Sequence, residues 1–249
     1  MKDIRIPETD IVISKREQLA TIFIVAFLLS LGLLISNAII NYSTDKKNEY
    51  LKAFKTDISE EFTYGMKTNL GNAFIYGELK AVDAISLDEL DGKYISVEKV
   101  KEKYTRHTRT VTVRSGKTTT TRTEVYYTWD TVHTDLYKCS KISFCEEEFP
   151  VNKIILPDEK YLTTIYETLS TRYAYYVRDY SYMGTVYTIL NNNTIADDTP
   201  FIEQNLNDTV DYYVNSTKMS VYLFWIGWIL GMIFLIVLFW SLENKWLEG

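Results

Sequence analysis

The chain has few of the residues that build metal or catalytic sites. Its 249 residues include two cysteines and only two histidines, His107 and His133, and these do not supply the paired spacings of a metal site. No G-x-S-x-G, H-E-x-x-H or complete phosphate-loop pattern occurs, because the run Gly116-Lys117-Thr118 lacks the required upstream glycine. We therefore predict a protein without metal, cofactor or enzymatic activity.

Two weaker hypotheses involve the histidines and the cysteines. A dyad of His107 with Asp130 or Asp135 has no support in sequence spacing. The pair Cys139 and Cys145 is compatible with a disulfide in an oxidising compartment, but two unrelated thiols in or near a strand are the simpler interpretation. The net charge of −6 gives no reason to expect a nucleic acid partner.

Charge is absent from two long apolar runs, Leu19–Ile40 and Met219–Leu242. Because about 20 apolar residues at 1.5 Å each cover the hydrocarbon core of a bilayer, both runs predict transmembrane helices. A cleaved signal peptide is the alternative for the first run, but its length and the lack of a suitable cleavage site favour a retained anchor. The predicted organisation is a tail (1–18), a first span (19–40), an extracytoplasmic domain (41–218), a second span (219–242) and a tail (243–249).

Small residues recur four positions apart in both spans, the spacing that lets helices approach closely in lipid. They are Ala26/Ser30, Gly32/Ser36 and Gly227/Gly231. We expect the face of Gly227 and Gly231 to receive the first span of the same chain, by either of its two pairs. Ordinary small-residue content is the alternative explanation, and self-association into a homo-oligomer stays open.

The middle segment is rich in Thr and Tyr, which favours strands. The predicted fold is α+β, a β-rich domain with a projecting hairpin and two or three helices, inserted between two transmembrane helices. Predicted strands are 75–84, 94–100, 106–114, 117–127, 142–144, 153–156, 173–177 and 185–190, the last two forming a hairpin that turns near 182–184. Predicted helices are 46–62, 157–172 and 201–216.

The strands 106–114 and 117–127 flank a Ser115-Gly116 turn and carry mostly Thr and Arg near the tip. Such a ribbon cannot bury a core face, so it should project into solvent, while Val125, Tyr126, Tyr127 and Trp129 rejoin the core. Its cationic residues are candidates for binding a partner: Arg106, His107, Arg109, Arg114, Lys117 and Arg122. The alternative is a charged edge that blocks aggregation.

A resemblance is carried by Gly77-Glu78-Leu79-Lys80-Ala81-Val82-Asp83, by the stretch from Tyr104 to Val111, and by Thr121-Arg122-Thr123-Glu124 leading to Tyr127-Thr128-Trp129-Asp130. These segments resemble an uncharacterised family of two-span membrane proteins of low-GC Gram-positive bacteria, their phages and mobile elements. The resemblance implies the same anchored, β-rich architecture. It supplies no active-site residue.

Lysine and arginine counts near the spans do not differ between the two sides. The charges of a long translocated segment carry less weight, so we expect a two-pass cell-membrane protein with both termini cytoplasmic. The predicted function is non-enzymatic: the outward domain binds a protein or envelope partner, in phage or mobile-element interaction if the resemblance holds. The alternatives are an oligomeric pore-forming or membrane-disrupting protein and an envelope-acting enzyme.

Overall fold

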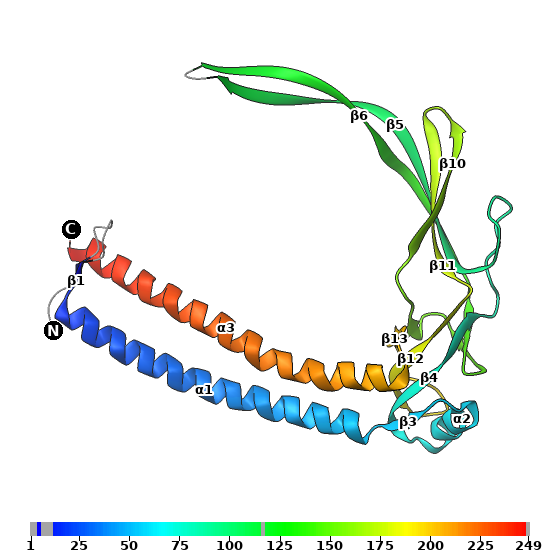
Figure 1. The fold of residues 1–249 in the computed structure, drawn as a ribbon, viewed down its shortest axis with the longest axis horizontal. Coiled ribbons are helices and arrows are strands. Elements are labelled where there is room, and N and C mark those ends of the chain that lie inside the picture. Colours follow the sequence, from blue (N-terminus) through cyan, green and yellow to red (C-terminus); the bar gives the residue numbers. More distant parts are fainter. Residues whose placement is uncertain (1–3, 6–11, 116–117, 248–249) are drawn as a thin grey trace. The chain divides into compact units, whose positions relative to one another are not determined.

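A computed structural model describes residues 4–5, 12–115 and 118–247 (Figure 1). The chain divides into two compact units. The helical unit comprises Met1–Lys52 and Val210–Gly249, and the β unit comprises Ala53–Thr209.

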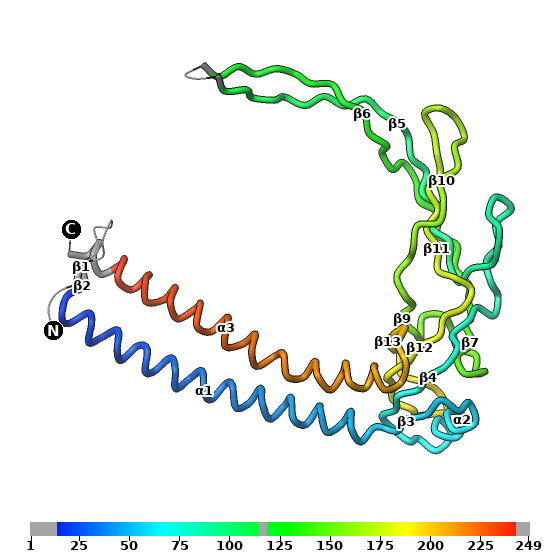
Figure 2. The backbone as a smooth tube through the Cα atoms, viewed as in Figure 1, coloured from blue at the N-terminus to red at the C-terminus, as the bar shows by residue number. Residues whose placement is uncertain are grey.

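Two long antiparallel helices make up most of the helical unit (Figure 2). They are α1 (Lys15–Lys52) and α3 (Leu206–Leu247), and a short antiparallel pair, β1 (Ile4–Arg5) and β2 (Val12–Ile13), precedes α1. Helix α1 begins with a capping box, because the Ser14 hydroxyl accepts from the Glu17 N–H while the Glu17 carboxylate accepts from the Ser14 N–H.

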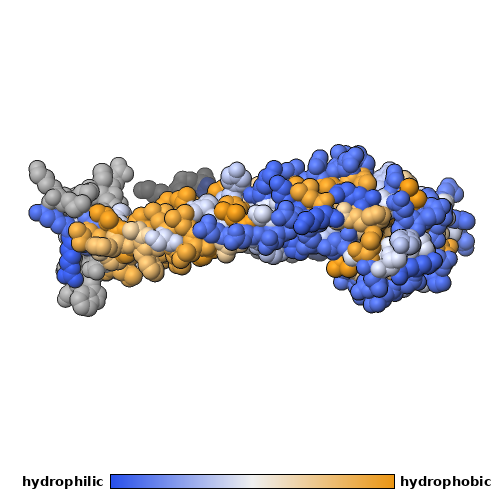
Figure 3. Space-filling view, turned by 90° about the horizontal axis from the view of Figure 1, so that it is seen from below, coloured by the Kyte–Doolittle hydropathy of each residue, from blue (hydrophilic) through white to orange (hydrophobic). Residues whose placement is uncertain are grey.

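Both helices are long and apolar enough to cross a membrane. Apolar side chains cover the middle of the pair in the face shown by Figure 3. Each helix also extends beyond the apolar run that predicted it, since propagation of an existing helix costs far less than nucleation. The first half of the helix predicted at 46–62 is therefore the end of α1, which stops at Lys52.

Three tryptophans of α3 bind α1 through their indole N–H groups. Trp225 donates to the Ser36 hydroxyl at 3.0 Å, and Trp228 donates to the Leu28 carbonyl at 3.2 Å. Trp240 donates to the hydroxyl of Thr21 at 2.9 Å. Because a membrane interior offers no water to these N–H groups, such bonds define which faces of the helices meet.

Of the two small-residue pairs in α1, one packs against α3 and the other does not. Gly32 and Ser36 are buried, and a Cβ at Gly32 would lie 2.5 Å from Trp228 Nε1. The other alternative, packing through Ala26 and Ser30, is not met, because both residues are exposed. The Ser30 hydroxyl donates to the Ala26 carbonyl of its own helix at 2.9 Å. At about 100° per residue, Ser30 lies nearly opposite Gly32 around the helix, so the two pairs cannot share one contact.

The expected packing is also wrong for the small residues of α3. Gly227 and Gly231 have no atom of the described chain within 4 Å of where a Cβ would stand. The large indoles of α3 rather than its glycines occupy the contact with α1. The face of Gly227 and Gly231 therefore stays open.

A seven-stranded sheet forms the larger part of the β unit. Its order is β8-β7-β4-β12-β13-β9, with β3 added to β4. The strands are β3 (Phe54–Thr56), β4 (Gly71–Ala81), β7 (Lys141–Phe144), β8 (Glu147–Pro150), β9 (Ile154–Ile155), β12 (Ser181–Leu190) and β13 (Thr199–Ile202). Helix α2 (Ser59–Thr68) buries Phe62 and Met66 in the core of this sheet.

The second sheet has four strands in the order β10-β11-β5-β6. They are β5 (Tyr94–Ser115), β6 (Thr118–Lys138), β10 (Lys160–Thr168) and β11 (Thr171–Asp179). Its small core is closed by Leu90 from the loop before β5. Strand β11 pairs with β5 only as far as Lys103. Beyond that point β5 and β6 continue as a two-stranded hairpin, residues 104–115 and 118–129, which we call the arm (Figure 1).

Two carboxylates of the β unit have shifted pKa values. Asp83 accepts hydrogen bonds from the backbone and hydroxyl of Ser140 and from the backbone of Lys141, which lowers its pKa to about 2. Glu98 shares a hydrogen bond with Glu159, and this contact, then burial, raises the pKa of Glu98.

Three predicted elements differ from the structure. Residues 160–168 of the helix predicted at 157–172 form strand β10, because the run Tyr-Leu-Thr-Thr-Ile-Tyr is mostly β-branched and aromatic, and Leu169 of the expected apolar face is 99% exposed in the turn. The strand predicted at 173–177 is confirmed within β11. Strands β11 and β12 belong to different sheets and form no hairpin. The segment 201–205 precedes α3, with residues 199–202 in β13.

Candidate interaction surface on the arm

The arm has two distinct faces because side chains alternate along each strand. Pairing runs from Ser96↔Lys138 to Ser115↔Thr118, with one shift between Lys101 and Glu102. Odd-numbered residues of β5 therefore share a face with even-numbered residues of β6. We call this the paired-charge face, and the opposite one the aromatic face.

On the paired-charge face, one glutamate serves two arginines. Glu124 accepts from Arg109 at 3.0 Å and from Arg122, and these bonds lower the pKa of Glu124. Arg109 also lies over the Tyr126 ring, 5.7 Å from its centroid. Both arginines thus have partners inside the chain, which reduces their capacity to hold an external anion.

His107 and Asp130 lie on the same face and do come together, with Nε2 to Oδ2 at 2.6 Å. Thr105 contacts the same His107 Nε2 at 3.0 Å. Hydrogen bonds from Thr128 and then His107 lower the pKa of Asp130. A nucleophile–base–acid relay needs two different ring nitrogens of the histidine, so this cluster is a local polar network and not a catalytic triad.

The aromatic face carries a group of rings at the base of the arm. Tyr104 stacks on Tyr127 with centroids 5.4 Å apart and contacts Trp129 at 5.2 Å. Trp129 meets Tyr166 of β10 edge-on at 5.9 Å. Three of these rings stay largely in solvent: Tyr104 is 45% exposed, Tyr127 52% and Tyr166 61%. We call these four residues the aromatic patch.

Arg172 fixes the aromatic patch to the sheet. Its guanidinium lies 4.2 Å from the centroid of the Trp129 ring, and its Nε donates to Glu102 at 2.6 Å. Because the guanidinium is half-buried, ion-paired and stacked on the indole, it holds the Trp129 ring rigidly in place. The patch is therefore a preformed surface.

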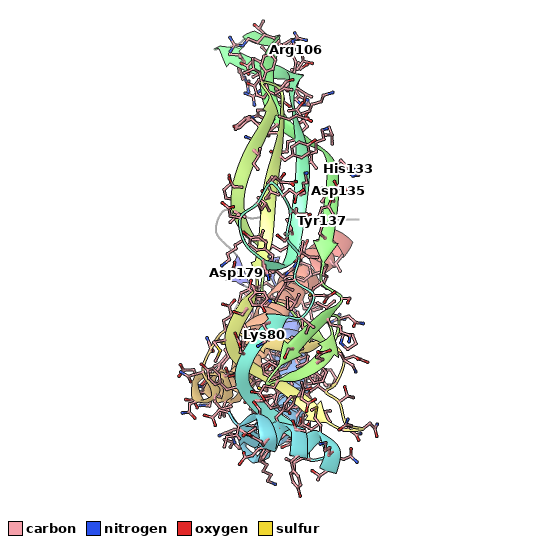
Figure 4. All side chains as sticks on the ribbon, turned by 90° about the vertical axis from the view of Figure 1, so that its right-hand side faces the viewer. Lys80, Arg106, His133, Asp135, Tyr137 and Asp179 are labelled. Carbon is pink, nitrogen blue, oxygen red and sulfur yellow. The ribbon has the colours of Figure 1, made fainter. Side chains whose placement is uncertain are left out.

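The predicted cationic set is divided between the two faces. His107, Arg109 and Arg122 lie on the paired-charge face, whereas Arg106 and Arg114 lie on the aromatic face and have no acidic partner among the described residues. Lys117 lies outside the described residues. Figure 4 shows Arg106 far along the arm from His133, Asp135 and Tyr137 of β6. The single cationic ribbon expected from sequence is thus two faces of different chemistry.

The expectation that Val125, Tyr126 and Tyr127 rejoin the core is wrong, since they are 47%, 41% and 52% exposed. Sequence reasoning also missed Tyr104, Tyr166 and Arg172 as members of a surface. Tyr166 falls in the helix predicted at 157–172, and that prediction removes it from the sheet. Only strand pairing reveals that residues separated by up to 68 positions share one face.

Both cysteines are buried free thiols, so the disulfide left open by the sequence is not formed. Burial raises the pKa of Cys139, and burial raises the pKa of Cys145 to about 12. Cys145 occupies a left-handed turn (φ 47°) with its Sγ directed at Gly77, where a Cβ would lie 2.2 Å away. In this part of the chain, glycine is needed to admit the thiol.

The fold and this surface define a class: an α+β chain in which two helices long enough to span a membrane flank a β-rich middle with an exposed hairpin arm. Comparison with known proteins found no matching family model, no matching curated protein and no matching solved structure.

Proposed function

We propose that the protein is a double-anchored membrane protein whose outward-facing β unit binds a protein or envelope partner, without catalysis. The observation that carries the proposal is the aromatic face of the arm. It combines exposed tyrosine rings with two arginines that lack acidic partners in the described chain.

The arm needs an explanation because a two-stranded ribbon is marginally stable by itself. Threonine pairs across the strands, such as Thr110↔Thr123 and Thr112↔Thr121, add a little stability. They do not cover the rings of Tyr104 and Tyr127. Tyrosine and arginine are the residues that most often carry binding energy in protein interfaces. A partner on this face would bury the patch and stabilise the ribbon at once.

The chemistry of the face also limits the partner. Arg106 and Arg114 favour carboxylate or phosphate groups. Arg106 lies opposite Tyr127 of the patch, Arg114 lies near the tip, and the threonines between these two arginines offer hydroxyl donors and acceptors. The partner surface should therefore combine apolar and acidic groups opposite the base of the arm and carry a further acidic group opposite its tip.

A photo-crosslinking experiment tests the choice of face. A benzoylphenylalanine replaces Tyr127 on the aromatic face or, as the matched control, Tyr126 on the paired-charge face; both native residues are exposed neighbours. Irradiation of intact cells should give discrete high-mass adducts from position 127 and few from position 126. Equal adducts from both positions, or none from 127, would contradict the proposal.

Arginine variants test the same interface in a second crosslinking measurement. Joint replacement Arg106→Ala and Arg114→Ala should weaken the adduct at 127 about tenfold, since a charged hydrogen bond contributes about 1.5–3 kcal/mol. Joint replacement Arg109→Ala and Arg122→Ala should leave it nearly unchanged, because those side chains serve Glu124. The reverse ranking would move the interface to the paired-charge face.

The orientation with both termini cytoplasmic is part of the proposal and needs its own reporter. The native thiols are buried, so a cysteine is introduced by Thr121→Cys in the exposed arm of a chain carrying Cys139→Ala and Cys145→Ala. An impermeant maleimide should label this cysteine in intact cells. Labelling only after permeabilisation would place the β unit in the cytoplasm.

Self-association is a second candidate function that one observation favours. The open face of Gly227 and Gly231 forms part of an apolar groove of about 400 Å³ that also includes Phe224, Trp228 and Met232. Small residues spaced by four let two helix backbones approach closely in lipid. Replacement Gly227→Leu should abolish a dimer seen by mass photometry in detergent; an unchanged mass would remove this candidate.

A further inference from the structure

A second groove in the helical unit differs from the first in carrying polar groups. It lies between α1 and α3, has a volume of about 500 Å³, and is aliphatic at one end, where Ile35, Ala38 and Ile39 line it. Its other end is lined by hydroxyl groups and by the ammonium of Lys46. A cavity of this kind fits an amphiphile better than a wholly apolar chain.

The groove lies where the apolar runs of both helices end. The first run stops at Ile40 and the second starts at Met219, and the hydroxyls of Ser43 and Ser220 touch at 3.1 Å. From Ala38 to Lys46 the helix rises about 12 Å at 1.5 Å per residue. That distance reaches from the hydrocarbon past the headgroup layer, which is about 5–8 Å thick on each side.

Donors and acceptors are arranged separately at the polar end. Tyr42 and Lys46 stand one helical turn apart on α1 and line the groove with O–H and N–H donors. Lys46 donates one of its three N–H groups to Glu49 at 2.9 Å, so a carboxylate balances the charge while the other N–H groups can still bind a phosphate oxygen. On α3, the hydroxyls of Ser216 and Thr217 donate to carbonyls of their own helix. These two therefore present oxygen lone pairs to the groove.

We propose that this groove binds one phospholipid whose headgroup carries hydrogen-bond donors. The phosphate is held by Tyr42 and Lys46, and the first part of an acyl chain lies along Ile35 and Ile39. Headgroup O–H or N–H groups donate to Ser216 and Thr217. Because Glu49 balances Lys46, selection depends on headgroup donors more than on net charge. Glycerol and ethanolamine headgroups therefore bind, and choline, which has no donor, binds poorly.

The inference rests on insertion of α1 and α3 in a membrane, as proposed above, and is tested on the full chain in mild detergent. Native mass spectrometry measures binding of dioleoyl phosphatidylglycerol, phosphatidylethanolamine and phosphatidylcholine. The first two should bind at one copy per chain and at least about tenfold more tightly than the third, the worth of a hydrogen bond or two in a partly dry site. Equal binding of all three lipids would overturn the proposal.

Variants separate this groove from the general lipid surface. The double variant Ser216→Ala and Thr217→Val, which removes the acceptors for the headgroup donors, should lose the tenfold preference, whereas Lys47→Met, next to the groove but not lining it, should keep it. Unchanged selectivity in the double variant refutes the site. Circular dichroism and the Tyr127 crosslink, measured on the same variants, show that folding and partner binding persist, so failure of the lipid site is distinguishable from failure of the proposed function.

A further measurement decides whether the bound phosphate belongs to a lipid or to a soluble compound. Free glycerol 3-phosphate carries the same anion without an acyl chain. It should not displace the lipid at millimolar concentration, because the aliphatic half of the groove would remain empty. Displacement at concentrations similar to the lipid would show a soluble phosphate site instead and overturn the lipid assignment.

Discussion

Replacement of Gly32 by alanine should separate the two helices of the helical unit. The new Cβ would lie 2.5 Å from Trp228 Nε1 and 3.0 Å from Cδ1. An ordinary contact needs about 3.4 Å, so the indole must move by roughly 1 Å. That movement also stretches the bond from Trp228 to the Leu28 carbonyl, now 3.2 Å, beyond hydrogen-bond length.

The expected loss of stability follows from three terms. Overpacking costs about 2 kcal/mol and the lost interhelical hydrogen bond about 0.6 kcal/mol. The better helix propensity of alanine returns about 1 kcal/mol. The net destabilisation of Gly32→Ala is therefore about 1.5 kcal/mol, measured by reversible unfolding in mixed micelles with tryptophan fluorescence as the probe.

Gly227→Ala is the matched control, since it is the same change in a membrane helix with open space at the Cβ. It should be neutral or stabilising by up to about 1 kcal/mol. The two variants should then differ by about 2.5 kcal/mol. Equal stabilities would refute the contact between Gly32 and Trp228. A larger loss in Gly227→Ala would show that its face packs against another helix.

Four other predictions concern the β unit. Asp83→Asn should lower the melting temperature above pH 4 but not near pH 2, because the depressed pKa of Asp83 makes its contribution disappear as pH falls from 3.8 to about 2. Glu98→Gln should stabilise the chain at pH 7 by no more than about 1 kcal/mol and should match wild type at pH 4. The reason is that the pKa of Glu98 is raised in the folded state, so the stability that protonated Glu98 contributes is lost as pH rises through that pKa. Gly77→Ala should lower the melting temperature, and adding Cys145→Ala should restore it, since the clash is with the Cys145 Sγ; no rescue would contradict this contact. Both thiols, Cys139 included, should react with a maleimide only in denaturant.

The two long apolar helices could be predicted from the sequence because a charge-free run of this length has few other outcomes. Their contact could not. Small-residue spacing occurs on both helices, and the sequence pattern gives Gly32, Ser30 and Gly227 the same standing. The structure distinguishes them through the tryptophans of α3, whose N–H groups require acceptors that α1 supplies.

The arm could be predicted as a projecting hairpin, but its register could not. A turn at Ser115-Gly116 between strands ending at 114 and starting at 117 would place Arg109 opposite Arg122. In the structure Arg109 lies opposite Glu124, and Ser115 pairs with Thr118. Opposite charges across a strand pair stabilise it, whereas like charges destabilise it. The energetic difference between the two registers is therefore carried by side chains that a local turn rule does not consider.

The helix predicted at 157–172 failed for a related reason. Leucine, isoleucine and tyrosine at positions 162, 165, 166 and 169 fit one face of a helix, whereas in a strand they point to both faces. No alternation therefore marks this strand, and only its pairing reveals it. Strand β10 pairs with β11, which in turn pairs with β5 up to Lys103. That placement brings Tyr166 to Trp129. The aromatic patch is thus a product of long-range pairing, and no local pattern contains it.

Exposed apolar surface occurs in the two units with different chemistry, and the difference supports different occupants. The helices expose leucine, isoleucine and phenylalanine, which have no polar atoms and need a bilayer to cover them. The arm exposes tyrosines, whose hydroxyl groups are satisfied by water while the rings remain available for contact. A surface of this second kind is soluble before it is occupied. Such a surface can stay exposed to water until a partner of the kind proposed above binds, whereas the aliphatic surface of the helices cannot.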